Sequence, residues 1–343
     1  MTDGLLTMTK EQLQRRLLSS MFTFVLGWRI KSERETMARR EVRFSAARIL
    51  LALACAISFG MVSVRAQQQD MSKVEIQTVP VAEGIYVLLG VGGNIGVFTG
   101  ADGVLLIDAQ SAALHDKIMA AVAKVSGGKP LRFLVNTHDH ADHTGGNALM
   151  AKEGAVIVAQ DNLRTRLSAA PANLNAQPNP KEALPVITFD KRLTLHFNGE
   201  DIDLIHPAPA HTDNDTIVYF RKANVMHVGD LLGSRGYPPI NLPGGFTMQG
   251  MIAAADEMLK MANADTKIIT GHRGPIVTAK DLQAQRDLWI TIRDRVRSAI
   301  RAGKTLAQVI AMKPTAEFDA NQPAGRTPDE FVKGVYEDLS RKP

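Results

Sequence analysis

The six consecutive positions 138–143 hold three imidazoles and two carboxylates, in the order His-Asp-His-Ala-Asp-His. The apolar run 131–136 directly before them predicts a buried strand, so the cluster begins where that strand ends and a loop and helix follow. A polar loop whose histidines only form hydrogen bonds is the simpler interpretation, but three of the nine histidines of the chain fall within these six residues. Such clusters are typical of metal or catalytic sites. The chain must then fold so that distant segments bring further ligands to this loop.

Two more histidines and one carboxylate stand beside turn-forming residues at the ends of predicted strands. His211 lies between two such strands, His272 follows a third, and Asp230 closes a fourth. A side chain at a strand end can converge with others on one site. These three residues are therefore the candidates for the remaining ligands.

The other four histidines have simpler explanations. His115 falls in a helical pattern, and His196 alternates like a half-buried residue of a strand. For His206 and His227 two interpretations stay open, a structural role and the orientation of a ligand imidazole, since ligand histidines are usually held by outer partners. None of the four belongs to the predicted ligand set.

The motif His-x-His-x-Asp-His, followed in order by separate His, Asp and His motifs, resembles the signature of the metallo-β-lactamase-fold hydrolases over about residues 74–276. The resemblance implies an α/β fold, namely an αββα sandwich of two mixed β-sheets flanked by helices, with a pair of metals at one edge. It also implies two ligand sets joined by a bridging carboxylate: His138, His140 and His211 for the first metal, Asp142, His143 and His272 for the second, and Asp230 between them.

Imidazole and carboxylate ligands suit two Zn²⁺ ions first, with iron or manganese as the alternatives. Asp142 and Asp230 supply two negative charges against the four positive charges of such a pair, which favours a bridging hydroxide. Because bound zinc lowers the pKa of water to about 7, we expect a nucleophile at neutral pH and predict that both carboxylates are catalytic. The expected reaction is hydrolysis of a carbonyl-type bond in a small molecule, such as an ester, thioester, lactone or β-lactam.

Other nucleophiles find little support in the sequence. No serine stands in a Gly-x-Ser-x-Gly setting, and the single cysteine, Cys55, lies in an apolar leader. The glycine-rich segment 91–96 feeds a strand and not a helix, so it does not match a phosphate-binding fingerprint. We interpret it either as a plain hairpin turn or as a flap over the metals.

Residues around the predicted ligands distinguish subgroups of the family. Cysteine-using β-lactamases have Cys at the position of Asp230 and Lys three residues later, where this chain has Gly233, and Arg235 is a weak substitute. Asp230 instead resembles glyoxalase II and exported hydrolases of the family, although glyoxalase II usually continues His-Thr-Pro-Gly-His where this chain has His-Thr-Asp-Asn-Asp from position 211. An exported general zinc hydrolase is our first interpretation. The alternatives are a true metallo-β-lactamase, an iron-dependent oxidoreductase similar to persulfide dioxygenases, and a noncatalytic binding protein.

The loops 162–185 and 233–245 are expected to select the substrate, and they carry no recognisable motif. Arg235, Tyr237 and Asn241 are the candidate substrate-binding residues, with ordinary surface-loop roles as the alternative. The identity of the substrate is not predicted.

The N-terminal segment concerns location and not the fold. Residues 49–64 carry no charge, follow four arginines and precede the small-residue exit Val-Arg-Ala that ends at Ala66. This pattern predicts a signal peptide over 37–66 with cleavage near Ala66, and hence a periplasmic or secreted protein. The run is shorter than the ~20 apolar residues of a spanning helix. Residues 1–36 are interpreted as a disordered upstream extension or a mis-called start.

The charge of the chain is concentrated in this leader. Residues 1–66 hold 11 Lys/Arg and 5 Asp/Glu, a net of +6, so the chain total of +5 leaves −1 for residues 67–343. A nucleic-acid partner is therefore not expected, because it requires a basic face. Contact with a membrane is expected only through an uncleaved leader, and the sequence indicates no oligomeric state.

The hydrophobic pattern predicts one domain over 67–276 and a helical C-terminal tail over 277–343 that packs on it. Strands are expected at 85–89, 95–99, 104–108, 131–136, 155–159, 185–189, 193–197, 202–206, 216–220, 225–228 and 267–269. Helices are expected at 113–125, 160–168, 248–261, 279–302, 305–312 and 327–340.

Overall fold

The computed structural model describes residues 70–169, 178–233, 236–272, 274, 276–322 and 326–341. The chain divides into two units after Asp70, and the elements below belong to the second unit, Met71–Pro343. The predicted upstream extension and signal peptide lie outside the described residues. No helix within the described ranges is long and apolar enough to cross a membrane.

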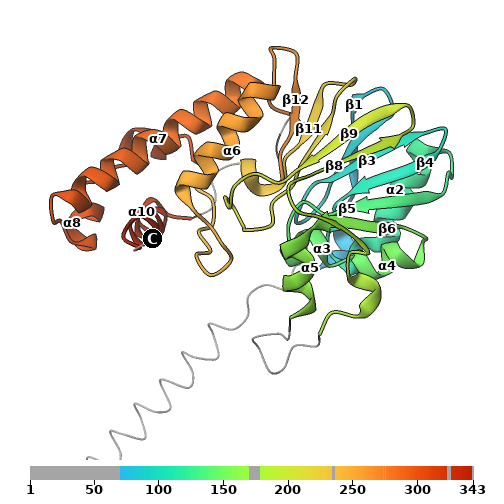
Figure 1. Ribbon diagram of the computed structural model, residues 1–343, viewed down its shortest axis with the longest axis horizontal. Helices are drawn as coiled ribbons and strands as arrows, with labels where there is room; N and C mark the ends of the chain where they lie inside the picture. Colours follow the sequence, from blue (N-terminus) through green and yellow to red (C-terminus); the bar gives the residue numbers. More distant parts are fainter. Residues whose placement is uncertain are drawn as a thin grey trace, which may run out of the picture. The chain divides into compact units, whose positions relative to one another are not determined.

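The described strands form two mixed sheets (Figure 1). The first sheet has the order β1 to β7, antiparallel from β1 to β4 and parallel from β4 to β7. Its strands are β1 (Gln77–Ala82), β2 (Ile85–Leu89), β3 (Ile95–Gly100), β4 (Gly103–Ile107), β5 (Leu131–Val135), β6 (Val156–Gln160) and β7 (Ile187–Phe189).

The second sheet has the order β12-β11-β10-β9-β8. Its neighbours are antiparallel except for β11 and β12, which run parallel. The strands are β8 (Arg192–Phe197), β9 (Glu200–Ile205), β10 (Ile217–Phe220), β11 (Val225–His227) and β12 (Lys267–Ile269).

Alternation of apolar side chains explains how the sheets stack. In β4, Val104 and Leu106 face one side and join a core formed with α2 (His115–Ser126), while Leu105 and Ile107 face the other side. That other side is the space between the sheets, where Ile107 belongs to the same core as residues of β9 and β10. Both faces of the first sheet are therefore buried, which explains why β4 is an unbroken apolar run.

The outer face of the second sheet is covered by α6 (Met248–Met261) and α7 (Ala279–Arg301), which share one apolar core with Ile217 and Ile268. Figure 1 shows these two helices on one side of the paired sheets and α2 on the other. The order of layers is helix, sheet, sheet, helix. The predicted αββα sandwich is therefore confirmed.

The C-terminal helices begin at threonine caps. The hydroxyls of Thr278, Thr305 and Thr327 accept hydrogen bonds from backbone N–H groups at the starts of α7, α8 (Leu306–Ala311) and α10 (Pro328–Leu339), each in a capping box. Apolar side chains then recur at helical spacing and bury against α6 and the second sheet, among them Leu282, Trp289, Ile292, Val296, Phe331 and Val335.

Local patterns failed to predict some elements. Strand β1 was not expected because it contains Pro80, which cannot donate a ladder hydrogen bond, and the structure places it at a sheet edge with an irregularity beside Pro80. The short helices α3 (Ala141–Thr144), α4 (Asn147–Lys152) and α9 (Ala316–Asp319) are too brief to show a period. Helix α5 (Asp161–Ser168) agrees with the expected range.

Candidate metal centre

Each predicted ligand stands just after a strand. Strand β5 leads into the loop of His138 and His140, and α3 then carries Asp142 and His143. The other three ligands come from three further strand ends: His211 follows β9, Asp230 follows β11 and His272 follows β12. The fold brings all seven side chains to one place, in two groups of potential metal ligands.

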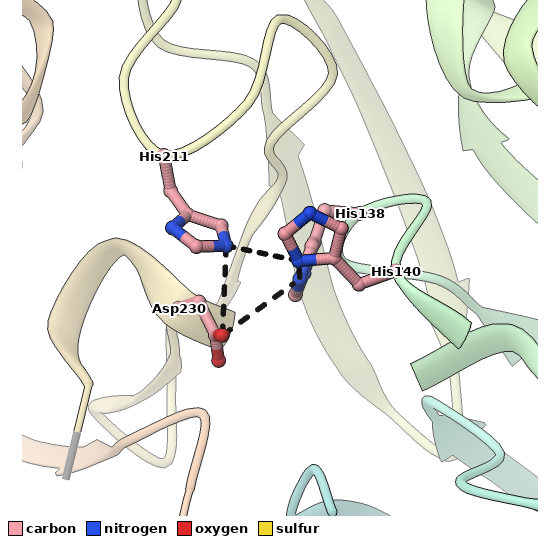
Figure 2. A group of neighbouring side chains, drawn as sticks. All are labelled: His138, His140, His211 and Asp230. Carbon is pink, nitrogen blue, oxygen red and sulfur yellow. Dashed lines mark hydrogen bonds and ion pairs between the residues drawn. The ribbon is translucent and has the colours of Figure 1, made fainter. Parts of the chain in front are cut away.

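The first group consists of His138, His140, His211 and Asp230, whose side chains point toward one another in Figure 2. His140 Nδ1 lies 3.1 Å from His138 Nε2 and 3.2 Å from His211 Nε2. Asp230 Oδ2 lies 3.5 Å from His211 Nε2 and 3.9 Å from His138 Nε2. Donor atoms placed tetrahedrally at 2.0–2.1 Å from a zinc ion stand about 3.3 Å apart. The spacing of this group therefore fits one zinc ion.

The second group consists of Asp142, His143 and His272. Asp142 Oδ2 lies 3.3 Å from His272 Nε2 and 3.8 Å from His143 Nε2. Asp230 also reaches this group, because its Oδ2 lies 3.2 Å from His272 Nε2 and its Oδ1 lies 3.4 Å from His143 Nε2. Asp230 thus lies between the two groups, as its predicted bridging role requires.

Two buried atoms indicate that a cation belongs here. His143 Nε2 and Asp230 Oδ1 face each other at 3.4 Å and are shielded from solvent, but neither forms a hydrogen bond in the described part of the chain. A buried polar atom without a partner is costly and rare. A divalent ion between them would satisfy both atoms, so the donor set fits a metal.

Burial favours the neutral, metal-binding form of two of the imidazoles. It lowers the pKa of His211 to about 4 and that of His138 well below its usual value, so both imidazoles are neutral. Burial opposes ionisation of Asp230, but the neighbouring His143 and His272 hold the pKa of Asp230 well below its usual range. Burial also acts to lower the pKa of His143, but the charges of Asp108 and Asp230 outweigh it and raise this pKa well above its usual value, and the hydrogen bond to Asp230 likewise outweighs burial and raises the pKa of His272. A metal ion would therefore have to displace a proton from these two imidazoles.

An outer carboxylate that the sequence analysis did not single out holds His143. Asp108, fully buried at the end of β4, lies 2.8 Å from His143 Nδ1 and accepts hydrogen bonds from the backbone N–H and the hydroxyl of Thr137, each at 2.7 Å. Such a carboxylate fixes the tautomer and orientation of a ligand imidazole. Asp108 closes a predicted strand just as Asp230 does, and that signal could have identified it.

We expect Asp108→Asn to weaken metal binding roughly 10–100-fold, because the amide keeps the shape of the side chain but removes the charge opposite His143. Asn also tolerates the left-handed backbone of this position, where φ is +66°, so the fold should remain. Competition with a zinc chelator measures the affinity. Asp116→Asn, an exposed change in the first turn of α2, is the matched control, and equal affinities of the two variants would contradict the role of Asp108.

Asparagine side chains tie the ligand loops together. Asn214 accepts from the backbone N–H of Asp139 at 2.9 Å and donates to its carboxylate at 2.8 Å, which joins the loop of His211 to the loop of His138. Asn94 donates to the carbonyls of Thr270 and His272, both at 2.8 Å. These hydrogen bonds form only in the folded chain, and no sequence motif predicts them.

The histidines outside the ligand set take structural positions. His227 lies 3.2 Å from the Asn94 carbonyl through Nε2 and accepts from Gly229 N–H at 3.4 Å, and His206 donates to the Asp215 carbonyl at 2.7 Å. Both therefore hold the backbone of ligand-bearing loops and not the ligand side chains. His115 lies 3.3 Å from Glu153, and His196 is exposed, which corrects the expectation that it is half-buried.

A cavity of about 290 Å³ opens at the metal centre. Its walls include the ligands His211, Asp230 and His272 and the candidate substrate residue Tyr237. The remaining lining residues come from the end of η4 (Gly229–Leu232) and the loop after it, from α7 and from the segment after α9: Leu232, Gly233, Gly236, Pro238, Pro239, Gln285, Trp289, Asn321 and Gln322.

The three candidate substrate residues differ in position. Tyr237 lines the cavity, but its hydroxyl donates to Asp319 at 2.7 Å. Asn241 is exposed and is not among the lining residues of the described chain; its side chain accepts from Gly244 N–H at 3.1 Å within its own turn. Arg235 lies outside the described residues.

The glycine-rich segment connects β2 and β3 as the expected hairpin and lies against the metal centre. Gly93 N–H donates to the Asp142 carbonyl at 3.1 Å. A Cβ added at Gly93 would stand 2.4 Å from the ring of His143, so only glycine allows this close approach. The hairpin therefore forms part of the ligand surroundings.

A family model described as the metallo-beta-lactamase superfamily matches residues 88–272. A 2,4-dinitroanisole O-demethylase subunit alpha of Nocardioides sp. (strain JS1661) is 24% identical over 210 residues, which make up 60% of this chain and 60% of that protein. The chain therefore spans less than two thirds of the length of this relative.

Solved structures show the same fold. A metallo-beta-lactamase from Pontibacter korlensis aligns with a TM-score of 0.52 and 16% identity, covering 63% of this chain and 99% of its own. A stereoselective inverting sec-alkylsulfatase from Pseudomonas sp. aligns with a TM-score of 0.60 and 16% identity, covering 76% of this chain and 50% of its own. The family model covers more than half of the chain and contains all seven predicted ligands. The chain therefore belongs to the metallo-beta-lactamase superfamily.

Proposed function

We propose that the protein is a binuclear zinc hydrolase that cleaves a carbonyl-type bond of a small molecule. The observation that supports this most directly is the gathering of seven donor side chains into two groups joined by Asp230. Two zinc ions held there would acidify a water molecule so that a nucleophile exists at neutral pH, and would polarise the carbonyl group.

Three of the candidate ligands also line the cavity in which a substrate would bind. His211 and Asp230 from the first group and His272 from the second line one cavity, so a substrate in this cavity contacts both groups. The side chain of Asp230 is 9% exposed and that of Asp142 is 44% exposed. Asp230 is therefore enclosed between the groups, whereas Asp142 is partly open to solvent.

The cavity favours a small and mainly uncharged substrate. Its volume of about 290 Å³ is at the lower end of ligand pockets, which span ~300–1,000 Å³. Leu232, Pro238 and Pro239 give the cavity an apolar part, and side-chain amides of α7 and of the segment after α9 also line it. Esters, thioesters and lactones of this size match such a lining.

A panel of substrates tests the proposal. The purified protein should contain about two zinc ions per chain and should cleave a phenyl ester, an acyl thioester or a simple lactone in a metal-dependent way. A chromogenic cephalosporin tests the narrower assignment as a true β-lactamase. 2,4-Dinitroanisole and a secondary alkyl sulfate test the reactions named for the relatives. The proposal fails if the metal-loaded protein turns over none of the carbonyl substrates.

Iron in place of zinc would favour oxidation instead of hydrolysis. One iron per chain, together with oxygen consumption on glutathione persulfide, would assign the protein as an oxidoreductase similar to persulfide dioxygenases. Asp230 and His272 are compatible with that site, but the two complete donor groups support a metal pair. Metal analysis and an oxygen electrode therefore separate the two functions.

Export remains part of the proposal, because the predicted signal peptide lies outside the described residues. N-terminal sequencing of protein recovered from the periplasm or medium should begin near position 67. Protein that is found only in the cytoplasm with residues 37–66 still attached would refute export.

A further inference from the structure

The imidazole of His211 differs from two neighbouring ligand imidazoles because its second ring nitrogen has no partner. His138 Nδ1 lies 3.1 Å from the hydroxyl of Thr137, and His143 Nδ1 lies 2.8 Å from Asp108. His211 Nδ1 is buried and forms no hydrogen bond in the described part of the chain. Ligand histidines are usually oriented by a hydrogen bond at this second nitrogen. The orientation of His211 therefore depends on the backbone of its own loop.

The loop of His211 connects β9 to β10, and its residues 206–216, all of them described, form no helix or strand. Its shape must therefore come from contacts with other segments. Before His211, the loop contacts the start of α6, where the N–H of Thr247 donates to the Ala210 carbonyl and its hydroxyl donates to the Pro209 carbonyl, both at 2.9 Å. After His211, the contacts are made by Asp213.

Asp213 forms hydrogen bonds with both its backbone and its carboxylate. Its N–H donates to the Gly244 carbonyl at 3.2 Å, and its carbonyl accepts from the side chain of Asn162 at 2.9 Å. Its two carboxylate oxygens accept from Nε and Nη2 of Arg166 at 2.6 and 2.7 Å. Bidentate pairs of this kind are strong and fix the geometry of both partners. Asn162 and Arg166 both belong to α5, so this helix holds the loop of His211.

The hydrogen bonds continue from Asp213 to the loop of His138 and His140. The side-chain amide of Asn214 donates to Asp213 Oδ1 at 3.1 Å and to Asp139 Oδ1 at 2.8 Å. A series of hydrogen bonds therefore runs from α5 to both loops that carry the histidines of the first ligand group.

A second bidentate pair provides a comparison. Arg221 Nε and Nη2 each lie 2.7 Å from a carboxylate oxygen of Asp203. The other described side chains that are hydrogen-bonded or ion-paired with Asp203 are Thr194 and Arg192 of β8. Arg221 follows β10 whereas His211 precedes it, so they stand at opposite ends of this strand. The same interaction thus occurs once beside a ligand loop and once away from it.

We infer that Arg166 is a positioning residue of the metal centre, which holds the loop of His211 through Asp213. His211 Nε2 then stays directed at His140 Nδ1, 3.2 Å away, and Asp230 Oδ2, 3.5 Å away. This inference rests on metal binding in the proposed function but not on the bond that is cleaved. The side chains of Arg166 and Asp213 are 29% and 30% exposed, so their pair contributes little to the stability of the whole domain. Its effect should be local.

Zinc affinity of the first ligand group tests the inference. The variant Arg166→Gln removes the guanidinium from its pair, and Arg221→Gln is the matched control. Both are measured by chelator competition in an Asp142→Ala background, which lacks a ligand of the second group alone. Arg166→Gln should weaken zinc binding about tenfold, at the lower end for a residue that supports a ligand, and Arg221→Gln should stay within about twofold. Arg166→Lys should recover only part of the loss, because an ammonium group cannot form the bidentate pair.

Hydrogen exchange of the metal-free protein provides a readout that needs neither metal nor substrate. The amides of residues 212–214 should exchange about tenfold faster in Arg166→Gln than in the wild type, because the loop opens more often. Arg221→Gln should leave their exchange unchanged. If exchange and zinc affinity change as expected while no substrate is cleaved, the proposed function fails and the inference stands. If Arg166→Gln and Arg221→Gln give the same exchange and the same affinity, the inference is overturned.

Discussion

The variant Asp230→Asn should lose turnover by roughly 10³-fold or more and should retain less than about two metals per chain, because the proposed metal pair would supply the activated nucleophile. Asp230 is the residue that contacts both ligand groups, with Oδ2 near His211 and His272 and Oδ1 near His143. An amide has nearly the same shape, but it carries no charge, and its NH₂ group cannot ligate a cation. The two groups would then lose their common ligand. Metal analysis and initial rates on the same preparation measure both effects.

The control for this variant is Asp265→Asn. Asp265 is exposed in the turn before β12, so the same chemical change should leave metal content and rate within about twofold of the wild type. Circular dichroism establishes that both variants are folded. A folded Asp230→Asn protein with two metals and normal turnover would show that the carboxylate does not bridge.

Removal of the metals should abolish hydrolysis and lower the melting temperature by about 10 °C. A ligand present at ~1,000 times its Kd stabilises the folded state by about 4 kcal/mol, and a domain of this size loses roughly 2–4 °C per kcal/mol. The physical cause is local: without a cation, the buried atoms His143 Nε2 and Asp230 Oδ1 have no hydrogen-bond partner in the described chain. Scanning calorimetry before and after chelation measures the change.

Restoration distinguishes a metal effect from damage by the chelator. Adding back two equivalents of zinc should recover both the melting temperature and the rate, whereas Mg²⁺ should recover neither, because Mg²⁺ prefers oxygen ligands and this site offers mainly imidazole nitrogens. A chelated protein that melts at the original temperature and still turns over substrate would exclude a structural and catalytic metal.

The sequence predicted most helices and strands whose hydrophobic residues recur with the period of that element. The run of β4 and the alternation in β9 and β10 have the spacing of strands, and α6 and α7 have the spacing of helices. Strand β1 and the helix α4 were missed because a proline and short length removed that signal. These two elements are stabilised by packing against segments that are distant in the sequence, so a short stretch of sequence does not predict them.

The candidate metal ligands could be selected from the sequence because they combine rare residue types with strand ends. His138, His211 and His272 all have both properties, and the structure brings them to one centre. The partners that orient them were less visible: Asn94 and Asn214 lie in ordinary turn sequences, and their importance comes from contacts with residues more than 70 positions away. Such contacts have no local signature.

The sequence by itself determined the chemical groups of the metal centre and the strand ends that carry them, because residue type and periodicity are local properties. Only the tertiary structure decided that Asp108 faces His143, and that Trp289 and Tyr237 line the same cavity as Asp230. These neighbours are chosen by the burial of whole sheet and helix faces. That burial depends on how layers far apart in the chain pack against each other, and no short stretch of sequence contains it.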